Sequence, residues 1–201
     1  GLQTEGYLKL GSVNPGVTVN SVTSSITTSS SDISIEADNF SFGTQGANAT
    51  TTGEFTFKPI AQSFDSALTW PINNFTVGNT ITGLTIGKST NTADINLSGA
   101  ISIAGPISVY GGSIDVNSNL TATGGNILLD ADIGGSGLKT GLDGMNVDNN
   151  VTIKTVTSGD ITMIGRSGNG PTSDVMGYRD ATGTIINSAG ALSITGYSNS
   201  T

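Results

Sequence analysis

The sequence contains neither cysteine nor histidine. The absence of cysteine excludes disulfide bonds, thiolate catalysis and zinc–cysteine sites. The absence of histidine removes the most common general base and the most common metal-binding side chain. Charged residues make up 11% of the chain, well below the roughly 25% of typical domains, and this low fraction argues against a disordered, charge-rich tail.

Basic residues are also scarce, because 7 lysines and arginines stand against 15 aspartates and glutamates, for a net charge of −8. No basic stripe is present, so binding to nucleic acid or to an anionic membrane surface is disfavoured. Uninterrupted apolar runs span only a few residues, whereas a membrane-spanning helix needs about 20. We expect no membrane insertion by this segment, and we expect it to be part of a longer protein.

Glycine is abundant, at 29 of 201 residues, together with serine, threonine and asparagine. The apolar content is concentrated in isoleucine, valine and leucine, which favour β-strands. Glycine and small polar residues are typical of turns. The composition therefore predicts an all-β, turn-rich protein.

The stretch "ISIAGPISVYGGSIDV" (101–116) contains three short strands, each of which alternates apolar, polar and apolar residues. Strands of three or four residues cannot hold a hairpin or an open sheet together alone. They need similar strands stacked above and below them. The residues predicted to point inward are Ile101, Ile103, Ile107, Val109, Ile114 and Val116.

The same pattern continues on both sides, and successive apolar pairs begin six or seven residues apart. Three such steps span about 19–20 residues, which is the length of a typical repeat unit. A coil with three short faces per turn, whose turns stack in parallel, has this arithmetic, and that coil is a parallel β-helix. The alternative is an antiparallel β-sandwich, but its strands recur about every 8–12 residues, and the turns here are denser.

We expect a single β-helix segment over residues 1–201, interrupted by insertions near 38–70, 131–146 and 165–183 where the spacing is irregular. Solenoid insertions emerge as loops or hairpins from one side, which is often the binding side. The first insertion contains the phrases "FSF" (40–42) and "FTF" (55–57). They are predicted to form a hairpin whose four rings pack together as a small core, because exposure of four rings is unfavourable.

The stretch "FTVGNTITGLTIGKSTNTADINLSGAISIAGPISVYGGSIDVNSNLTATGGNILLDAD" (75–132) resembles the repetitive strand regions of long bacterial surface adhesins. These are the filamentous-haemagglutinin-like proteins and the giant repeat adhesins of Gram-negative bacteria. The phrase "SAGALSITG" (188–196) is similar to their right-handed β-helix rungs. The resemblance implies a right-handed parallel β-helix, an extracellular location at the bacterial cell surface, and an adhesive or structural role. It offers no catalytic residues to transfer.

Two sets of residues are candidates for binding. Aspartates at 130, 132, 143 and 148 could supply oxygen ligands to calcium, although their spacing matches no known calcium loop, and turn aspartates commonly bind backbone amides instead. In "MIGRSGNGPTSDVMGYRDATG" (163–183), residue types enriched at interfaces gather in one insertion. The alternative for that segment is a solvated loop with an internal salt bridge. The candidate ligand-contact residues are Arg166, Met176, Tyr178 and Arg179.

These observations favour a non-enzymatic adhesin segment: a rigid β-helical stalk or adhesive module with no cofactor and no catalytic residues. Its expected partners are host or bacterial surface glycans or proteins, with lateral self-association as a further interaction. The alternative is a polysaccharide-binding or polysaccharide-degrading β-helix protein. A degrading enzyme needs a carboxylate pair, or a carboxylate with a nearby base, on one face, and the five lysines are too scattered to supply one.

Overall fold

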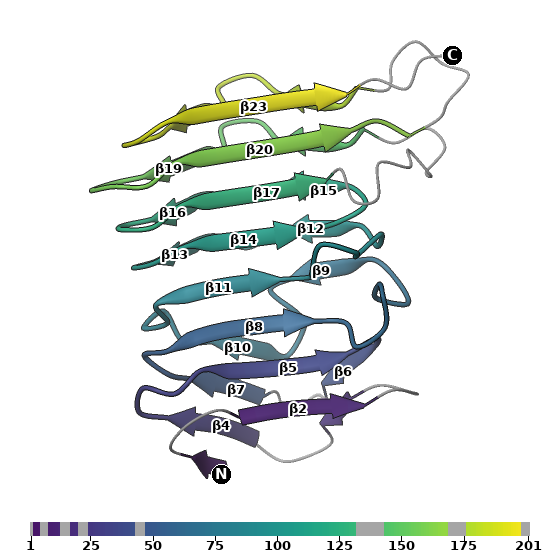
Figure 1. Ribbon diagram of the computed structural model, residues 1–201, viewed down its shortest axis with the longest axis vertical. Helices are drawn as coiled ribbons and strands as arrows, with labels where there is room; N and C mark the ends of the chain where they lie inside the picture. Colours follow the sequence, from purple (N-terminus) through teal and green to yellow (C-terminus); the bar gives the residue numbers. More distant parts are fainter. Residues whose placement is uncertain are drawn as a thin grey trace.

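The computed structural model describes residues 2–4, 8–12, 17–19, 24–42, 47–131, 143–168 and 176–197. Within these ranges the chain consists of short β-strands joined by turns. The strands lie one above another in a stack, with β2 near one end and β23 at the other (Figure 1). The described residues form no helix with the length and hydropathy that a membrane span requires.

One eight-stranded sheet runs along the whole stack, and a five-stranded sheet covers part of a second face. The strands of the eight-stranded sheet are β2 (Leu8–Ser12), β5 (Ile33–Ala37), β8 (Glu54–Lys58), β11 (Gly83–Ile86), β14 (Ile107–Tyr110), β17 (Ile127–Ala131), β20 (Ile161–Arg166) and β23 (Leu192–Tyr197). Those of the five-stranded sheet are β9 (Leu68–Trp70), β12 (Ile95–Leu97), β15 (Ile114–Val116), β18 (Met145–Val147) and β21 (Tyr178–Asp180).

The remaining strands form three smaller sheets. The first four-stranded sheet contains β1 (Leu2–Thr4), β4 (Ser24–Thr28), β7 (Ala47–Thr50) and β10 (Phe75–Val77). The second contains β13 (Ile101–Ile103), β16 (Leu120–Ala122), β19 (Thr152–Thr155) and β22 (Ile185–Asn187). A two-stranded sheet contains β3 (Val17–Val19) and β6 (Phe40–Phe42).

Strand pairing follows one rule among the described residues. Every pairing is parallel, and it joins strands that lie three places apart in the sequence, as β11 pairs with β14 and β14 with β17. Two pairings that this rule would give are missing from the described part: β6 does not pair with β9, and β10 does not pair with β13. The molecule is therefore all-β, with parallel strands in stacked sheets, as a parallel β-helix or solenoid requires. An antiparallel sandwich does not account for these pairings.

The residue spacing within the stack matches the predicted repeat between residues 95 and 127. Ile101 lies opposite Leu120 and Ile107 opposite Ile127, at spacings of 19 and 20 residues. The next partner of Leu120 is Ile153, 33 residues further on. The chain between Leu120 and Ile153 includes the predicted 131–146 insertion. Most of that insertion, residues 132–142, lies outside the described part.

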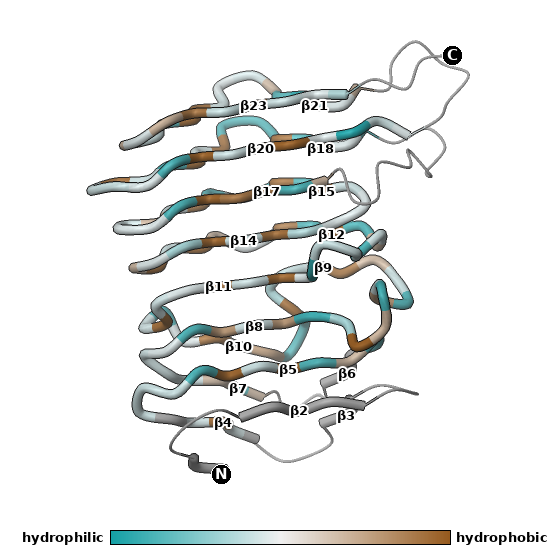
Figure 2. The backbone as a smooth tube through the Cα atoms, viewed as in Figure 1, coloured by the Kyte–Doolittle hydropathy of each residue, from teal (hydrophilic) through white to brown (hydrophobic). Residues whose placement is uncertain are grey.

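The inward positions form continuous apolar rows inside the stack. All six residues predicted to point inward are buried, from Ile101 at 6% exposure to Ile107 and Val116 at 0%, so this prediction is confirmed. Figure 2 shows apolar residues recurring at matching places along successive strands of the eight-stranded sheet. The physical reason is the two-residue period of a strand, which sends every second side chain to the same face.

The predicted aromatic hairpin is wrong. Strand β8, which carries Phe55 and Phe57, pairs in parallel with β5 and β11 in the eight-stranded sheet, while β6 pairs with β3. Phe55 and Phe57 are fully buried and occupy the inner rows, between Ile33 and Ile35 on one side and Leu84 and Ile86 on the other. The packing role expected for these two rings is confirmed. The side chains of Phe40 and Phe42 lie outside the described part.

Candidate functional site

The four predicted ligand-contact residues lie at the C-terminal end of the stack. Arg166 ends β20, Met176 precedes β21, and Tyr178 and Arg179 begin β21. The segment between them, residues 169–175, lies outside the described residues, and so does Asp174. Here the backbone at Gly165, in β20, lies against that of Gly177, just before β21. A Cβ on residue 165 would collide with the carbonyl oxygen of Gly177, so this close approach requires glycine.

Two of these residues are joined to the neighbouring acidic segment through Asp143. The backbone N–H of Met176 donates to Asp143 Oδ1 at 2.8 Å, and Arg179 Nη1 lies 3.4 Å from Asp143 Oδ2. The side chain of Arg179 remains 57% exposed, and Met176 is 48% exposed. Asp143 and residues 176–179 therefore form one surface, and Met176 and Arg179 can contact a partner there.

The other two residues are engaged in packing. The guanidinium of Arg166 lies over the ring of Tyr197, 4.3 Å from its centroid, in a cation–π arrangement. Tyr178 is half-buried and packs against the core. Burial raises the pKa of Tyr178 to about 12, and Asp180 adds to the rise. The phenol of Tyr178 therefore stays protonated at neutral pH and cannot serve there as a base.

The candidate calcium ligands do not share one face. Asp130 is in β17 of the eight-stranded sheet, whereas Asp143 and Asp148 flank β18 of the five-stranded sheet. Asp132 lies outside the described residues. The described aspartates and glutamates form no group of three or more that could hold a metal ion.

One carboxylate of the five-stranded sheet, that of Asp115, is influenced by the charges of three other aspartates. Asp115 lies in register between Asn96 and Asn146, and its row ends at Arg179. Burial raises the pKa of Asp115 above its ordinary value, and the charges of Asp94, Asp143 and Asp148 add to the rise, while a hydrogen bond with Asn146 lowers it. Asp115, the one carboxylate among the described residues of this row, therefore binds its proton more readily than a solvated aspartate does.

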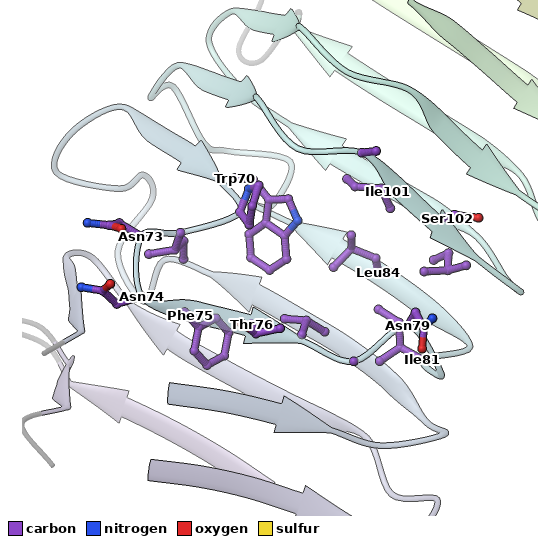
Figure 3. A pocket seen from close by; sticks show the side chains of 16 residues that line it. Trp70, Asn73, Asn74, Phe75, Thr76, Asn79, Ile81, Leu84, Ile101 and Ser102 are labelled. Atoms are coloured by element: carbon purple, nitrogen blue, oxygen red, sulfur yellow. The ribbon is translucent and has the colours of Figure 1, made fainter. Parts of the chain in front are cut away.

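A cleft of about 530 Å³ opens where β10 and β13 fail to pair (Figure 3). Phe75 to Val77 line one side and Ile101 to Ile103 the other. Leu84 and Ile81 also line it, and both are almost fully buried. None of the described residues that line the cleft is charged.

Trp70 lies at one end of this cleft, next to the aromatic part of the core. Its ring is 5.8 Å from that of Phe57 and 6.1 Å from that of Phe55, measured between centroids. Trp70 is only 5% exposed, so its ring is largely buried beside these phenylalanines. Trp70 thus joins the aromatic part of the core to the lining of the cleft.

Sequence reasoning missed the cleft. The segment between β9 and β10 contains a turn, in which the N–H of Phe75 donates to the carbonyl of Ile72 at 3.0 Å, and Asn74 adopts a positive φ of 62°. After this turn β10 pairs with β7, while β13 pairs with β16 and not with β10. The adjacent "NN" of 73–74 is the one available signal, since asparagine tolerates left-handed backbone.

Comparisons of this chain with protein-family profiles, with curated proteins and with solved structures each found no match.

Proposed function

We propose that the chain is a rigid, non-enzymatic segment of a bacterial cell-surface adhesin. In this proposal the stacked sheets close into a right-handed parallel β-helix of about 19–20 residues per uninterrupted turn. The segment acts outside the cell as a stalk or adhesive module that attaches to host or bacterial surface glycans or proteins.

The observation that carries the proposal is the continuous ladder of the eight-stranded sheet. It extends from β2 to β23 with parallel pairing at every step. Its inner rows are filled by buried side chains such as Ile35, Phe57 and Val109. A solenoid in which each rung contacts only its neighbours extends in one dimension, so it can hold a binding surface away from an anchor.

The surface chemistry supports a non-catalytic role. The exposed cation Arg179 is paired with Asp143, and burial raises the pKa of Tyr178 to about 12. The middle outward row of the eight-stranded sheet contains small hydroxyl residues, such as Thr85, Ser108 and Thr162. The next outward row contains an ion pair, in which Lys58 Nζ lies 3.3 Å from Glu36 Oε1. The hydroxyl groups of the middle row keep this surface hydrated.

Attachment is expected at the surface formed by Asp143 and residues 176–179, because Met176 and Arg179 are its exposed anchors. The test measures binding of the purified chain to arrays of surface glycans and extracellular proteins. The double variant Met176→Ala/Arg179→Ala should lose binding at least about tenfold, since each side chain contributes on the order of 1 kcal/mol or more. Lys154→Ala removes a cation from the second four-stranded sheet and is the matched control.

Retained binding in the double variant would move the attachment surface elsewhere. Depolymerisation of a polysaccharide by the purified chain, abolished by one carboxylate substitution, would replace the proposal with the alternative of a polysaccharide-degrading β-helix protein. Binding to purified polysaccharides that persists in the double variant, with no binding to extracellular proteins, would favour the alternative of a polysaccharide-binding protein.

A further inference from the structure

The cleft beside β10 and β13 lies between two strand edges. β10 is the last strand of the first four-stranded sheet, and β13 begins the second. In Figure 1, β10 lies low in the stack near β8, while β13 lies beside β14. Elsewhere along this face neighbouring strands pair directly, as β7 pairs with β10 and β13 with β16.

Backbone groups from both edges face the cleft. In a parallel ladder, the N–H and C=O of alternate residues point to opposite neighbours. Ile101 donates to Asn119 at 2.9 Å and Ile103 accepts from Thr123 at 2.9 Å, so both of these residues face β16. The N–H and C=O of Ser102 therefore point the other way, toward the cleft.

The same alternation applies to β10. Ala47 donates to the carbonyl of Asn74 at 2.7 Å, and Gly78 donates to the carbonyl of Ala49 at 2.9 Å. These bonds place the N–H and C=O of Thr76 toward β7, so those of Val77 point toward the cleft. Each wall thus presents one donor and one acceptor in the arrangement that a neighbouring strand would use.

The side chains of the two edges have matching phase. Val77 points inward and packs on the core, and so do Ile101 and Ile103. Thr76 and Ser102, between the inward positions, are both exposed. A strand placed between the edges would meet the same inward–outward–inward order on both sides.

The size of the cleft suits a short strand. One residue in a sheet occupies about 3.3 Å along the strand, 4.8 Å between strands and 10 Å between layers, or about 160 Å³. The cleft volume of about 530 Å³ therefore accommodates about three residues. The absence of charge among the described lining residues favours an uncharged occupant.

We propose that this cleft binds an extended, uncharged peptide segment of apolar–polar–apolar sequence, which adds a β-strand between β10 and β13. The two apolar side chains enter the space next to Leu84 and Ile81, and the polar side chain lies level with Ser102 and Thr76. Main-chain hydrogen bonds to Ser102 and Val77 provide affinity, and the alternating side chains provide specificity.

The test uses synthetic peptides and the fluorescence of Trp70, the single tryptophan of the chain, which lines the cleft. The probe is acetyl-Ser-Asn-Val-Thr-Val-Thr-Asn-Ser-amide, with a small set of relatives in which the two valines are varied among Val, Ile, Leu and Phe. Titration of the full chain should give a saturable change in Trp70 emission and a matching calorimetric signal. The same peptides N-methylated at both apolar residues should not bind, because they cannot donate to the β13 edge.

Protein variants test the same contact from the other side. Ser102→Pro removes the N–H that faces the cleft and leaves the bonds from Ile101 and Ile103 to β16 in place, as proline on an edge strand permits. It should weaken binding about fivefold to tenfold. Ser102→Ala is the matched control and should bind within about twofold, because it keeps the backbone donor.

If the wild-type chain binds the unmodified peptides and does not bind the N-methylated ones, the proposal is supported even if Ser102→Pro fails to fold. The proposal is overturned if none of the peptides binds, or if N-methylated peptides bind equally well. It is also overturned if neutral oligosaccharides, such as cello- or chito-oligosaccharides, change Trp70 emission while the peptides do not. That last result would assign the cleft to a glycan.

Discussion

Neighbouring residues of one strand have opposite roles in this molecule. Ile107 is fully buried and lies in register between Leu84 and Ile127. Ser108, the next residue, faces outward in the row that contains Thr85 and Leu128. The stability of the stack at this point therefore depends on the identity of the first residue and tolerates change at the second.

We expect Ile107→Asp to unfold the chain or to lower its free energy of unfolding by more than about 4 kcal/mol, because it buries an unpaired carboxylate. Ser108→Asp introduces the same group one residue away, facing solvent, and should change stability by less than about 1 kcal/mol. Urea denaturation followed by circular dichroism measures both. Equal stability of the two variants would mean that Ile107 does not point into the core.

A second pair of neighbours differs in the space beside the Cα atom. A Cβ on Gly125 would lie 2.5 Å from the carbonyl carbon of Gly105 and even closer to the nitrogen of Pro106, in the rung below. A Cβ on Gly124 would meet nothing closer than the carbonyl oxygen of Ala104 at 3.3 Å. The turn before β17 thus requires glycine at position 125 and not at position 124.

Gly125→Ala should accordingly destabilise the fold by about 2–4 kcal/mol, since backbone must move to admit the methyl group. Gly124→Ala should stay within about 1 kcal/mol of the parent, helped by the lower entropy of its unfolded chain. Thermal unfolding of the two variants gives the comparison. A milder effect at 125 than at 124 would contradict the stacking of this turn on Gly105 and Pro106.

Among the elements, β15 carries an unfavourable charge. Asp115 lies in the outer row of the five-stranded sheet, and burial raises its pKa above the ordinary value of 3.8, with Asp94, Asp143 and Asp148 contributing. A raised pKa means that the native state holds this proton more tightly than the unfolded chain does. Stability from this group is therefore present at low pH and is lost as the pH rises through the raised pKa.

Asp115→Asn should raise the melting temperature at pH 7, because it removes the charge and extends an amide row between Asn96 and Asn146. The gain should shrink as the pH falls through the raised pKa of Asp115, because the parent then takes up the proton and loses its charge. Asp65→Asn, at an exposed position, is the control and should have a smaller effect. Melting curves across this pH range would contradict the account if Asp115→Asn lowered stability at neutral pH.

How far sequence predicts an element depends on how local its determinants are. The strands around 101–129 were predictable, because their apolar residues alternate with a regular spacing that the core enforces. Phe55 and Phe57 were predicted to be buried, but the hairpin was wrong, since the phrases "FSF" and "FTF" do not encode which strand each one pairs with. The cleft was not predicted, because it depends on β10 pairing below and β13 pairing above.

For the candidate ligand-contact residues, composition identified exposed anchors only in part. Met176 and Arg179 are exposed, whereas Arg166 stacks on Tyr197 and Tyr178 packs inward. The alternation of strand β21 explains the difference between Tyr178 and Arg179, since adjacent residues point to opposite faces. The stacking of Arg166 depends on β23, which is 26 or more residues further along the chain, so local sequence could not reveal it.

In the molecule as a whole, each described strand pairs with strands that lie three places away in the sequence. Ser102 lies opposite Thr121, Asn96 opposite Asp115, and Ser108 opposite Leu128. These three pairs belong to three different sheets. A chain that pairs strands in this way on three faces places consecutive strands on different faces, whereas a chain of hairpins places them side by side.

Disulfide cross-linking tests this claim most directly, because the chain has no cysteine of its own. The pairs S102C/T121C, N96C/D115C and S108C/L128C each place two cysteines on adjacent strands, about 4.8 Å apart and within the range that a disulfide spans. All three should cross-link on mild oxidation, and S102C/S108C, only six residues apart in sequence, should not. Cross-linking of S102C/S108C together with failure of the other three pairs would contradict the stacked parallel fold.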